Sequence, residues 1–182
     1  KTLLTTSCTD ALEMCAILTG VDSESEVIMP SYTFVSTANA FALRGAKIVF
    51  VDSEENTPNL DADKLEELIT PKTKVFMFSS PCNPSGAVYS KAELEALANL
   101  FKKYPQITIL SDEIYEYINF IGKHESIAQF SEIKDQVIVI NGLSKGFAMT
   151  GWRLGYTASN ITLAKAMEKL QGQFTSGTSS IT

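Results

Sequence analysis

The stretch Val137-Ile-Val-Ile-Asn-Gly-Leu-Ser144-Lys145 contains the residues that decide the fold. Its first four residues are apolar and β-branched, without polar alternation, which is typical of a strand buried on both faces of a parallel sheet. Lys145 follows this strand and therefore lies near its carboxyl end. Open α/β sheets bind their ligands beyond the carboxyl ends of the strands, so the sequence predicts Lys145 at a ligand site.

Other apolar runs and several helical patterns alternate along the rest of the chain. The further runs that predict strands are Thr2–Thr5, 26–29, Lys47–Val51, 74–78, 107–110 and 154–157. Helical patterns cover 10–19 and 61–69, begin after Ser90 (which forms a capping box with Glu93), and begin again near Asn160. The tail from Gly172 onward is small and polar, which predicts an exposed end. The alternation indicates a single α/β domain with a mostly parallel sheet and crossover helices.

Composition excludes several classes of function. The chain has 182 residues and a formal net charge of -6, which fits one domain with a substantial core and argues against nucleic acid as a partner. Its apolar runs are too short to cross a membrane. Cys8, Cys15 and Cys82 are an odd number without metal-ligand spacing, so we expect a cytoplasmic protein. His124 is the single histidine, and we expect a polar loop residue and no metal site.

A lysine and an arginine eight positions apart stand in Ser144-Lys145-Gly-Phe-Ala-Met-Thr-Gly-Trp-Arg153. Leu143 and Phe147 flank Lys145, and desolvation by such neighbours would favour a neutral, nucleophilic amine. The alternative is an ordinary solvated lysine. Arg153 can bind a phosphate through two parallel hydrogen bonds, and its alternative is a surface ion pair.

Ser7-Cys8-Thr9 lies between the first expected strand and the first expected helix. Amides at a helix N-terminus carry partial positive charge and suit a phosphate, and the hydroxyls of Ser7 and Thr9 add donors. Plain N-capping of the helix is the alternative. In the phosphate interpretation, the carboxylate of Asp10 must point away from the bound anion.

Three more side chains suit a flat, charged heterocycle. Asp112 ends a strand and should be largely buried, so its carboxylate needs a partner such as a protonated pyridine nitrogen; a helix or loop cap is the alternative. Tyr115 and Asn83 can reach the hydroxyl of such a ring, although a simple β-turn also explains Asn83-Pro-Ser-Gly86. Phe34 can stack on the ring, or be a core aromatic.

Together these groups match the needs of pyridoxal phosphate. This cofactor requires an amine that forms a Schiff base, a carboxylate for its pyridine nitrogen, donors for its ring hydroxyl, and cations and amides for its phosphate. Each piece alone is a weak signal. We therefore predict a pyridoxal phosphate site in which Lys145, Asp112 and Tyr115 are the catalytic residues.

The motifs resemble two branches of the fold-type I aminotransferases. From about residue 74, the segments Ser80-Pro-Cys-Asn-Pro-Ser-Gly86, Ser111-Asp-Glu-Ile-Tyr115 and Ser144 to Tyr156 resemble the aspartate-type class I enzymes. Residues 1 to about 73 resemble the DegT/StrS sugar aminotransferases, most of all the dTDP-4-amino-4,6-dideoxygalactose transaminases. The matching stretches are Leu4-Thr-Thr-Ser-Cys-Thr-Asp-Ala-Leu-Glu-Met14 and Val27 to Phe41. A chimera of two homologous large domains is one hypothesis.

The resemblance implies a role for each candidate residue. Lys145 matches the Schiff-base lysine, Asp112 the partner of the pyridine nitrogen, and Tyr115 and Asn83 the ligands of the ring hydroxyl. The residues that match the phosphate site and the stacking aromatic are Ser7, Cys8, Thr9, Ser144, Arg153 and Phe34. It further implies a three-layer sandwich with a seven-stranded sheet, in which the strand at 154–157 is antiparallel. A homodimer and two small-molecule substrates, an amino donor and a keto acceptor, are also implied.

Departures from the family pattern bear on the activity. Many class I enzymes carry a serine three residues before the lysine, where this chain has Gly142. From its length we expect the chain to lack the family's N-terminal arm and its C-terminal small domain, which in the family supplies an arginine for the substrate carboxylate. Arg44 is the one arginine besides Arg153. An incomplete aminotransferase, an inactive scaffold that keeps the fold, and another fold-type I reaction such as decarboxylation or elimination therefore stay open.

Overall fold

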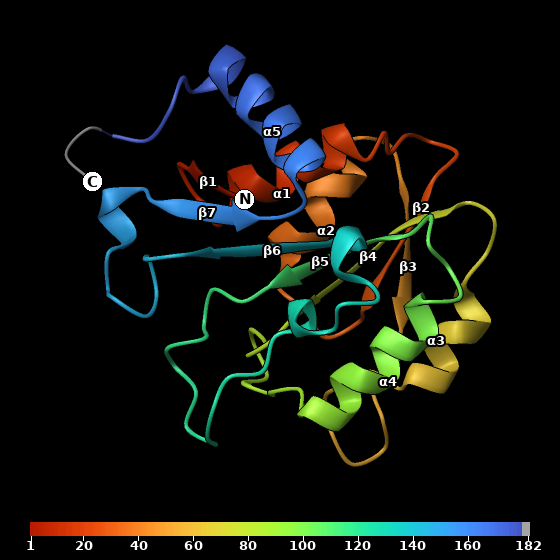
Figure 1. Ribbon diagram of the computed structural model, residues 1–182. Coiled ribbons are helices and arrows are strands. Elements are labelled where there is room, and N and C mark those ends of the chain that lie inside the picture. Colours follow the sequence, from red (N-terminus) through yellow and green to blue (C-terminus); the bar gives the residue numbers. More distant parts are fainter. Residues whose placement is uncertain (180–182) are drawn as a thin grey trace.

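The computed structural model describes residues 1–179 and contains one seven-stranded sheet in the order β1-β7-β6-β5-β4-β2-β3. Figure 1 shows the arrangement of the strands and helices. The strands are β1 (Thr2–Thr5), β2 (Glu26–Pro30), β3 (Lys47–Val51), β4 (Thr73–Ser79), β5 (Thr108–Asp112), β6 (Val137–Gly142) and β7 (Gly155–Ala158). All seven predicted strands are present; β1 and β3 have the predicted ends, and the ends of the other five lie within two residues of the prediction.

Five neighbouring strands, β3, β2, β4, β5 and β6, run parallel to one another. β7 is antiparallel to β6 and also to β1, which confirms the predicted antiparallel strand. β5 extends further than its apolar run because the polar residues Ser111 and Asp112 still pair with both neighbours, Asp112 with Ser79 and with Ile140. Ser111 and Asp112, at the carboxyl edge of the sheet, are therefore part of the hydrogen-bonded ladder.

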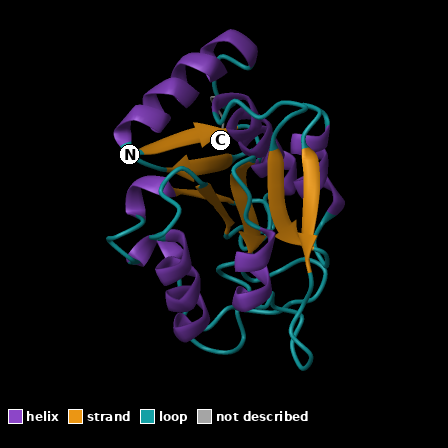
Figure 2. Ribbon diagram, turned by 90° about the vertical axis from the view of Figure 1, so that its right-hand side faces the viewer, coloured by secondary structure: helices purple, strands orange, loops and turns teal. Residues whose placement is uncertain are grey.

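Helices cover both faces of the sheet. They are α1 (Cys8–Leu18), α2 (Val35–Ala42), α3 (Ala62–Leu68), α4 (Lys91–Phe101) and α5 (Ile161–Phe174). α1, α2 and α5 lie on one face, whereas α3 and α4 lie on the other, and Figure 2 shows the sheet twisting between these layers. The predicted α/β three-layer sandwich is confirmed.

Two helix predictions differ from the structure. α2 was not expected, and its N-cap residue, Phe34, makes no side-chain cap hydrogen bond, so the usual sequence signal for a helix start is absent. The tail from Gly172 is largely exposed over 172–179, as expected, but α5 continues through Gly172 to Phe174; the rest of the predicted tail, 180–182, lies outside the described residues. The predicted capping box is present, because the Ser90 and Glu93 side chains each bond the other's backbone N–H.

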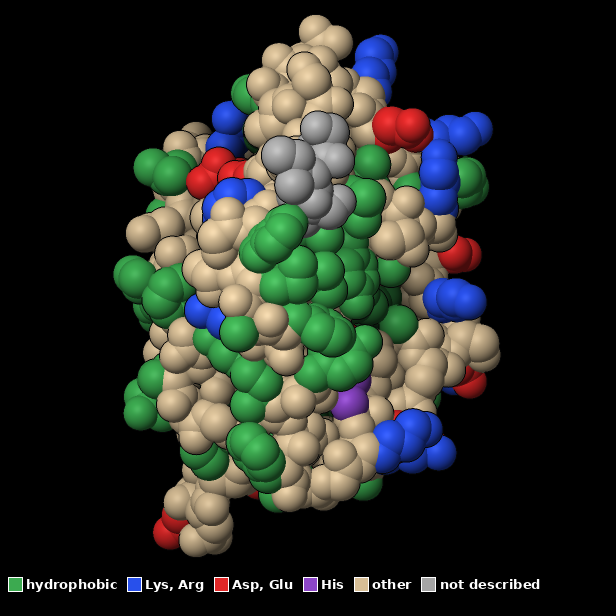
Figure 3. Space-filling view, turned by 90° about the vertical axis from the view of Figure 1, so that its left-hand side faces the viewer, with side chains coloured by type: hydrophobic (Ala, Val, Ile, Leu, Met, Phe, Trp, Pro, Cys, Tyr) green, Lys and Arg blue, Asp and Glu red, His purple; other side chains and the backbone are tan. Residues whose placement is uncertain are grey.

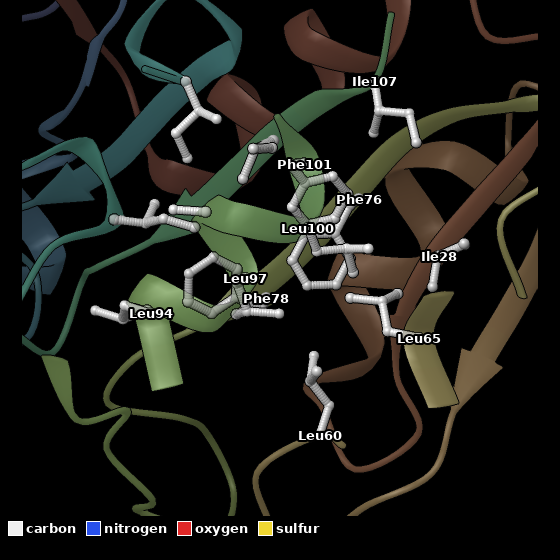
Figure 4. Close-up of a cluster of buried hydrophobic side chains, with 14 of the residues drawn as sticks. Ile28, Leu60, Leu65, Phe76, Phe78, Leu94, Leu97, Leu100, Phe101 and Ile107 are labelled. Atoms are coloured by element: carbon white, nitrogen blue, oxygen red, sulfur yellow. The ribbon is translucent and has the colours of Figure 1, made fainter. Parts of the chain in front are cut away.

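Hydrophobic clusters fill the two spaces between sheet and helices. On the α3 and α4 side, Phe76 and Phe78 of β4 pack against Phe101 and Leu97 of α4 (Figure 4). The Phe76 and Phe101 rings lie 4.8 Å apart between centroids. On the other side, alternate residues of the same strands, such as Met77, pack against α1 and α2. Strands with apolar side chains on both faces explain the unbroken apolar runs in the sequence.

Replacing Phe76 by alanine should destabilise the domain strongly. Phe76 is fully buried and contacts two other aromatic rings, so its removal leaves a cavity between β4 and α4. We expect Phe76→Ala to lower the free energy of unfolding by about 3–5 kcal/mol in urea titrations. Phe120→Ala, at a side chain that is 90% exposed, is the control and should change it by less than about 0.5 kcal/mol.

Candidate active site

A cavity of about 240 Å³ opens where the sheet strands β4, β5 and β6 end. All ten predicted site residues line it: Ser7, Cys8, Thr9, Phe34, Asn83, Asp112, Tyr115, Ser144, Lys145 and Arg153. They come from segments up to 146 residues apart in the sequence, between Ser7 and Arg153. The parallel register brings these segments to one edge, as the position of Lys145 after its strand predicted.

The N-terminus of α1 forms one wall of the cavity. Ser7 is the N-cap, and its Oγ accepts a hydrogen bond of 3.0 Å from the Asp10 amide, so the predicted N-capping is present. The first amides of a helix have no partner within the helix and point outward, which suits an anion. Asp10 itself lines a separate cavity between α1 and α5, with Glu13. Its carboxylate is therefore not among the groups that line the main cavity.

Gly155 allows β7 to approach this helix start closely. A Cβ at Gly155 would lie 2.8 Å from the Ser7 carbonyl carbon and 3.0 Å from the Cys8 amide nitrogen. These separations are shorter than van der Waals contact, so any side chain here would push the helix start away. Gly142, where many class I enzymes have serine, is similarly restricted, because its Cβ would lie 2.8 Å from the Leu154 carbonyl oxygen.

Asp112 lies at the end of the central strand β5, and its side chain lines the cavity. Its Oδ1 accepts a hydrogen bond of 3.1 Å from the Ile114 amide. Among residues 1–179, no lysine, arginine or histidine forms an ion pair with this carboxylate. Burial raises the pKa of Asp112 to about 6, partly offset by the Ile114 hydrogen bond. The site thus holds a carboxylate that lacks a cationic partner.

Lys145 faces the same cavity, and its Nζ lies 5.8 Å from the centroid of the Tyr115 ring. The expectation that Leu143 and Phe147 desolvate this amine is wrong, because Lys145 is exposed in the structure. Phe147 is half-exposed and packs edge-on against Tyr117, with 5.0 Å between ring centroids. The flanking aromatic residue therefore covers a neighbouring loop and leaves the amine open to the cavity.

Arg153 stands in the left-handed backbone region, with φ of 56°. Its Nη1 donates a hydrogen bond of 2.9 Å to the Thr150 carbonyl, which holds the exposed guanidinium at the cavity. Within residues 1–179 it forms no ion pair, so the surface ion-pair alternative finds no support. Asp112, Lys145 and Arg153 all lie near enough to Cys8 to affect its pKa, which burial raises. Charges of both signs thus face one small space.

The remaining predicted residues also reach the cavity. Asn83 follows β4 in a turn in which the Gly86 amide donates to the Cys82 carbonyl, four residues earlier. This is an α-turn in place of the expected β-turn, and Asn83 also lines the cavity. Phe34 is 49% exposed, and the alternative that it is a core aromatic is wrong.

Sequence reasoning missed seven lining residues. They are Leu12, Thr33, Ser36, Thr37, Ser79, Ile114 and Thr150. Three of these form a hydroxyl-rich group around the start of α2, the helix that was also missed, so an unrecognised helix start concealed them. The run of hydroxyl residues after the strand at 26–29 was the one sequence signal that could have revealed them.

His124 lies in a loop, as the sequence predicted, but it is half-buried and paired. Its Nε2 lies 3.0 Å from Oε2 of the buried Glu113, which the sequence prediction did not include. This pairing raises the pKa of His124, with burial acting in the opposite direction. Potential ligand atoms of Glu113, Glu116 and His124 all lie within 4.8 Å of one another, next to the cavity wall formed by Ile114 and Tyr115.

Comparison with known proteins decides the family. The family model described as "Aminotransferase class I and II" matches residues 1–182. The chain belongs to this family. Family members depend on pyridoxal phosphate, which agrees with the cofactor predicted from the sequence.

Individual relatives agree with this assignment. The chain is 41% identical over 170 residues to a probable aspartate/prephenate aminotransferase of Rhizobium leguminosarum. The aligned region covers 91% of this chain and 42% of the relative. It is 43% identical over 164 residues to an aspartate aminotransferase of Bacillus subtilis, covering 88% and 42%. The solved aspartate aminotransferase of Rhizobium meliloti superposes with a TM-score of 0.93 at 35% identity, covering 100% of this chain and 46% of that one. The chain therefore spans about half the length of the relatives that it matches.

Replacing Asp112 by asparagine should stabilise the cofactor-free protein at neutral and alkaline pH. The pKa of Asp112 is about 6 in the folded state and about 4 in the unfolded state, so folding favours the protonated form. The stability that Asp112 contributes is therefore present below about pH 4 and is lost as pH rises through about 6, and the variant lacks this pH-dependent contribution. We expect a gain of about 2 kcal/mol at pH 8, after allowing for water in the cavity, and none at pH 3.5. Urea unfolding at both pH values measures it, and an equal effect at both would contradict the pKa shift.

Proposed function

We propose that this chain is the pyridoxal phosphate-binding large domain of an aminotransferase that transfers an amino group between an amino acid and a keto acid or keto sugar. One observation carries the proposal: a single cavity combines the Lys145 amine, the N-terminus of α1 and the Asp112 carboxylate, which forms no ion pair within residues 1–179. These are three different chemical groups, and one molecule with an aldehyde, a basic ring nitrogen and a phosphate would satisfy all of them.

The chemistry of the lining residues suits this cofactor. Desolvation without a cationic partner raises the pKa of Asp112, and a protonated ring nitrogen would supply the missing cation. The α1 amides and Arg153 offer donors for a doubly charged phosphate. Phe34 and Asn83 line the space between these ends and would contact the ring face and the ring hydroxyl. At about 240 Å³ the cavity is slightly smaller than the ~300–1,000 Å³ that is typical of small-molecule sites.

Each residue then has one task. When bound, the cofactor withdraws electrons from the substrate through its ring. The Lys145 amine would bind the aldehyde carbon and, once released by the substrate amine, accept a proton at Nζ and return it. Asp112 would hold the ring nitrogen protonated. Tyr115 and Asn83 would orient the ring by bonding its hydroxyl. Ser7, Cys8, Thr9, Ser144 and Arg153 would hold the phosphate.

The described cavity has a single arginine, Arg153, which the proposed phosphate site already uses. Arg153 is the arginine that lines it, while Arg44 precedes the amino end of β3, on the other edge of the parallel strands. We infer that a single large domain binds the cofactor and that residues outside this chain bind the substrate carboxylate. The relatives' names, aspartate and prephenate aminotransferase, favour an acidic amino donor.

Three finer hypotheses remain proposals. The suggested DegT/StrS origin of residues 1 to about 73 gains no support, because one class I and II family model matches residues 1–182. Homodimerisation fits the hydrophobic side chains that gather over the middle of one face (Figure 3). A cytoplasmic location fits three cysteines that are all free. None of the described helices has the length and hydropathy for crossing a bilayer.

The cofactor proposal predicts that Lys145 binds pyridoxal phosphate covalently. We expect added cofactor to give a yellow absorption band that survives gel filtration and, after borohydride reduction, a mass increase on the peptide containing Lys145. Lys145→Ala should lose both signals. Lys165→Ala, at an exposed position of α5, is the control and should keep them. An equally yellow Lys145→Ala protein would show that the assignment of the lysine is wrong.

Activity and mere binding can be separated by one half-reaction. With excess aspartate or glutamate, a working aminotransferase domain should convert bound pyridoxal phosphate to pyridoxamine phosphate, which chromatography of the released cofactor detects. Binding without conversion would support the inactive-scaffold alternative. Release of carbon dioxide or ammonia in place of pyridoxamine phosphate would indicate decarboxylation or elimination.

A further inference from the structure

Next to the cavity wall lies a group of polar side chains that the proposed chemistry does not use. We call this group the polar clamp; it consists of Ser111, Glu113, Glu116, His124, Ser126 and Asn141. Several of these side chains are almost fully buried, with exposures of 1% for Ser111 and Asn141 and 3% for Glu113. A buried carboxylate is costly unless it is well bonded, so this arrangement calls for an explanation.

Glu113 is the centre of the polar clamp. Its Oε1 accepts hydrogen bonds from Ser126 at 2.6 Å and from Ser111 at 2.9 Å, and its Oε2 lies 3.0 Å from Nε2 of His124. Its amide donates to the Ile140 carbonyl at 2.8 Å, which continues the β5–β6 ladder by one residue. Successive side chains of an extended segment point to opposite faces. Anchoring Glu113 on one face therefore directs Asp112 to the other, where the cavity lies.

A second contact joins the turn after Asp112 to the strand that precedes Lys145. Nδ2 of Asn141 donates to Oε2 of Glu116 at 2.8 Å, while Oδ1 of Asn141 accepts from the Gly142 amide. Glu116 follows Tyr115, and its amide donates to the Glu113 carbonyl at 2.9 Å. The hydrogen bonds thus run from the Asp112–Tyr115 segment to the end of β6, three residues before Lys145.

Apolar contacts reinforce the same connection. A Cβ on Gly146 would lie 2.7 Å from the Cβ of Tyr117, so the Lys145 loop and the turn after Tyr115 touch directly. Tyr117 also packs against Phe147. The segments that carry Asp112, Tyr115 and Lys145 are therefore connected by packing as well as by the polar clamp.

We propose that Glu113 is a positioning residue of the cofactor site, which sets the direction of Asp112 and the place of Tyr115 relative to Lys145 through its bonds to Ser111, Ser126 and His124. This inference rests on the proposed function. The same residues form a possible metal cluster, but both oxygens of Glu113 already have partners, and Oε2 of Glu116 accepts from Asn141. A metal ion would have to displace these hydrogen bonds.

Two substitutions of Glu113 test the proposal. Glu113→Ala removes the carboxylate, so Ser111, Ser126 and His124 lose their hydrogen-bond acceptor. Glu113→Gln keeps a side-chain oxygen that can accept from the two serines. We expect Glu113→Ala to weaken pyridoxal phosphate binding about tenfold in fluorescence titrations, and Glu113→Gln to stay within about threefold of the wild type. Glu95→Ala, at an exposed position of α4, is the control and should bind as the wild type does.

The outcomes separate positioning from stability alone. If Glu113→Ala lowers the unfolding temperature but binds the cofactor as tightly as the wild type, the positioning role is refuted. If that variant does not fold, Ser126→Ala replaces it; a weakening of about threefold supports the proposal, and unchanged affinity overturns it.

Failure of the proposed function can be told apart from failure of this inference. If the wild type does not bind pyridoxal phosphate, both are refuted. If the wild type binds it and the Glu113 variants bind equally well, only the inference is refuted. Zinc chloride that raises the unfolding temperature of the wild type, but not of His124→Gln, would identify the cluster as a metal site in place of the polar clamp.

Discussion

The parallel pairing of β5 with β4 on one side and β6 on the other is the constraint on which the site depends. It places Asp112 beside Ser79 and Ile140, so the segments that follow all three strands leave the sheet at one edge. Those segments carry Asn83, Tyr115 and Lys145. β7 then returns antiparallel to β6 and brings Arg153 and Gly155 next to the start of α1. The strand register thus determines which side chains share the cavity, and the conformations of the loops determine how far apart those side chains lie.

Apolar burial on both faces of the sheet keeps that ladder in register. A slip of one residue would turn Phe76 and Phe78 away from α4 and Met77 away from α1 and α2. A one-residue slip of β5 would likewise turn Asp112 away from the cavity. Core packing and site geometry therefore depend on a common alternation of side chains, which is why β5 can carry both core residues and the half-buried carboxylate of Asp112.

Much of the fold and of the site could be predicted because their signals are local. Unbroken runs of β-branched residues predict buried strands, and polar residues immediately after them predict the site, as with Asp112 and Lys145. The missed features depend on tertiary contacts. The helix α2 begins without a capping side chain, Lys145 is exposed because Phe147 packs on Tyr117, and His124 pairs with Glu113, eleven residues away. No spacing rule connects such partners, because the turn between them has no regular periodicity.

The capped start of α1 has a consequence for the energetics of ligand capture. Ser7 already bonds the Asp10 amide, and Gly155 lets β7 support the same residues from behind. The helix start therefore holds its shape before any anion arrives. A receptor that is ordered in advance loses little conformational freedom on association, so more of the electrostatic attraction appears as affinity.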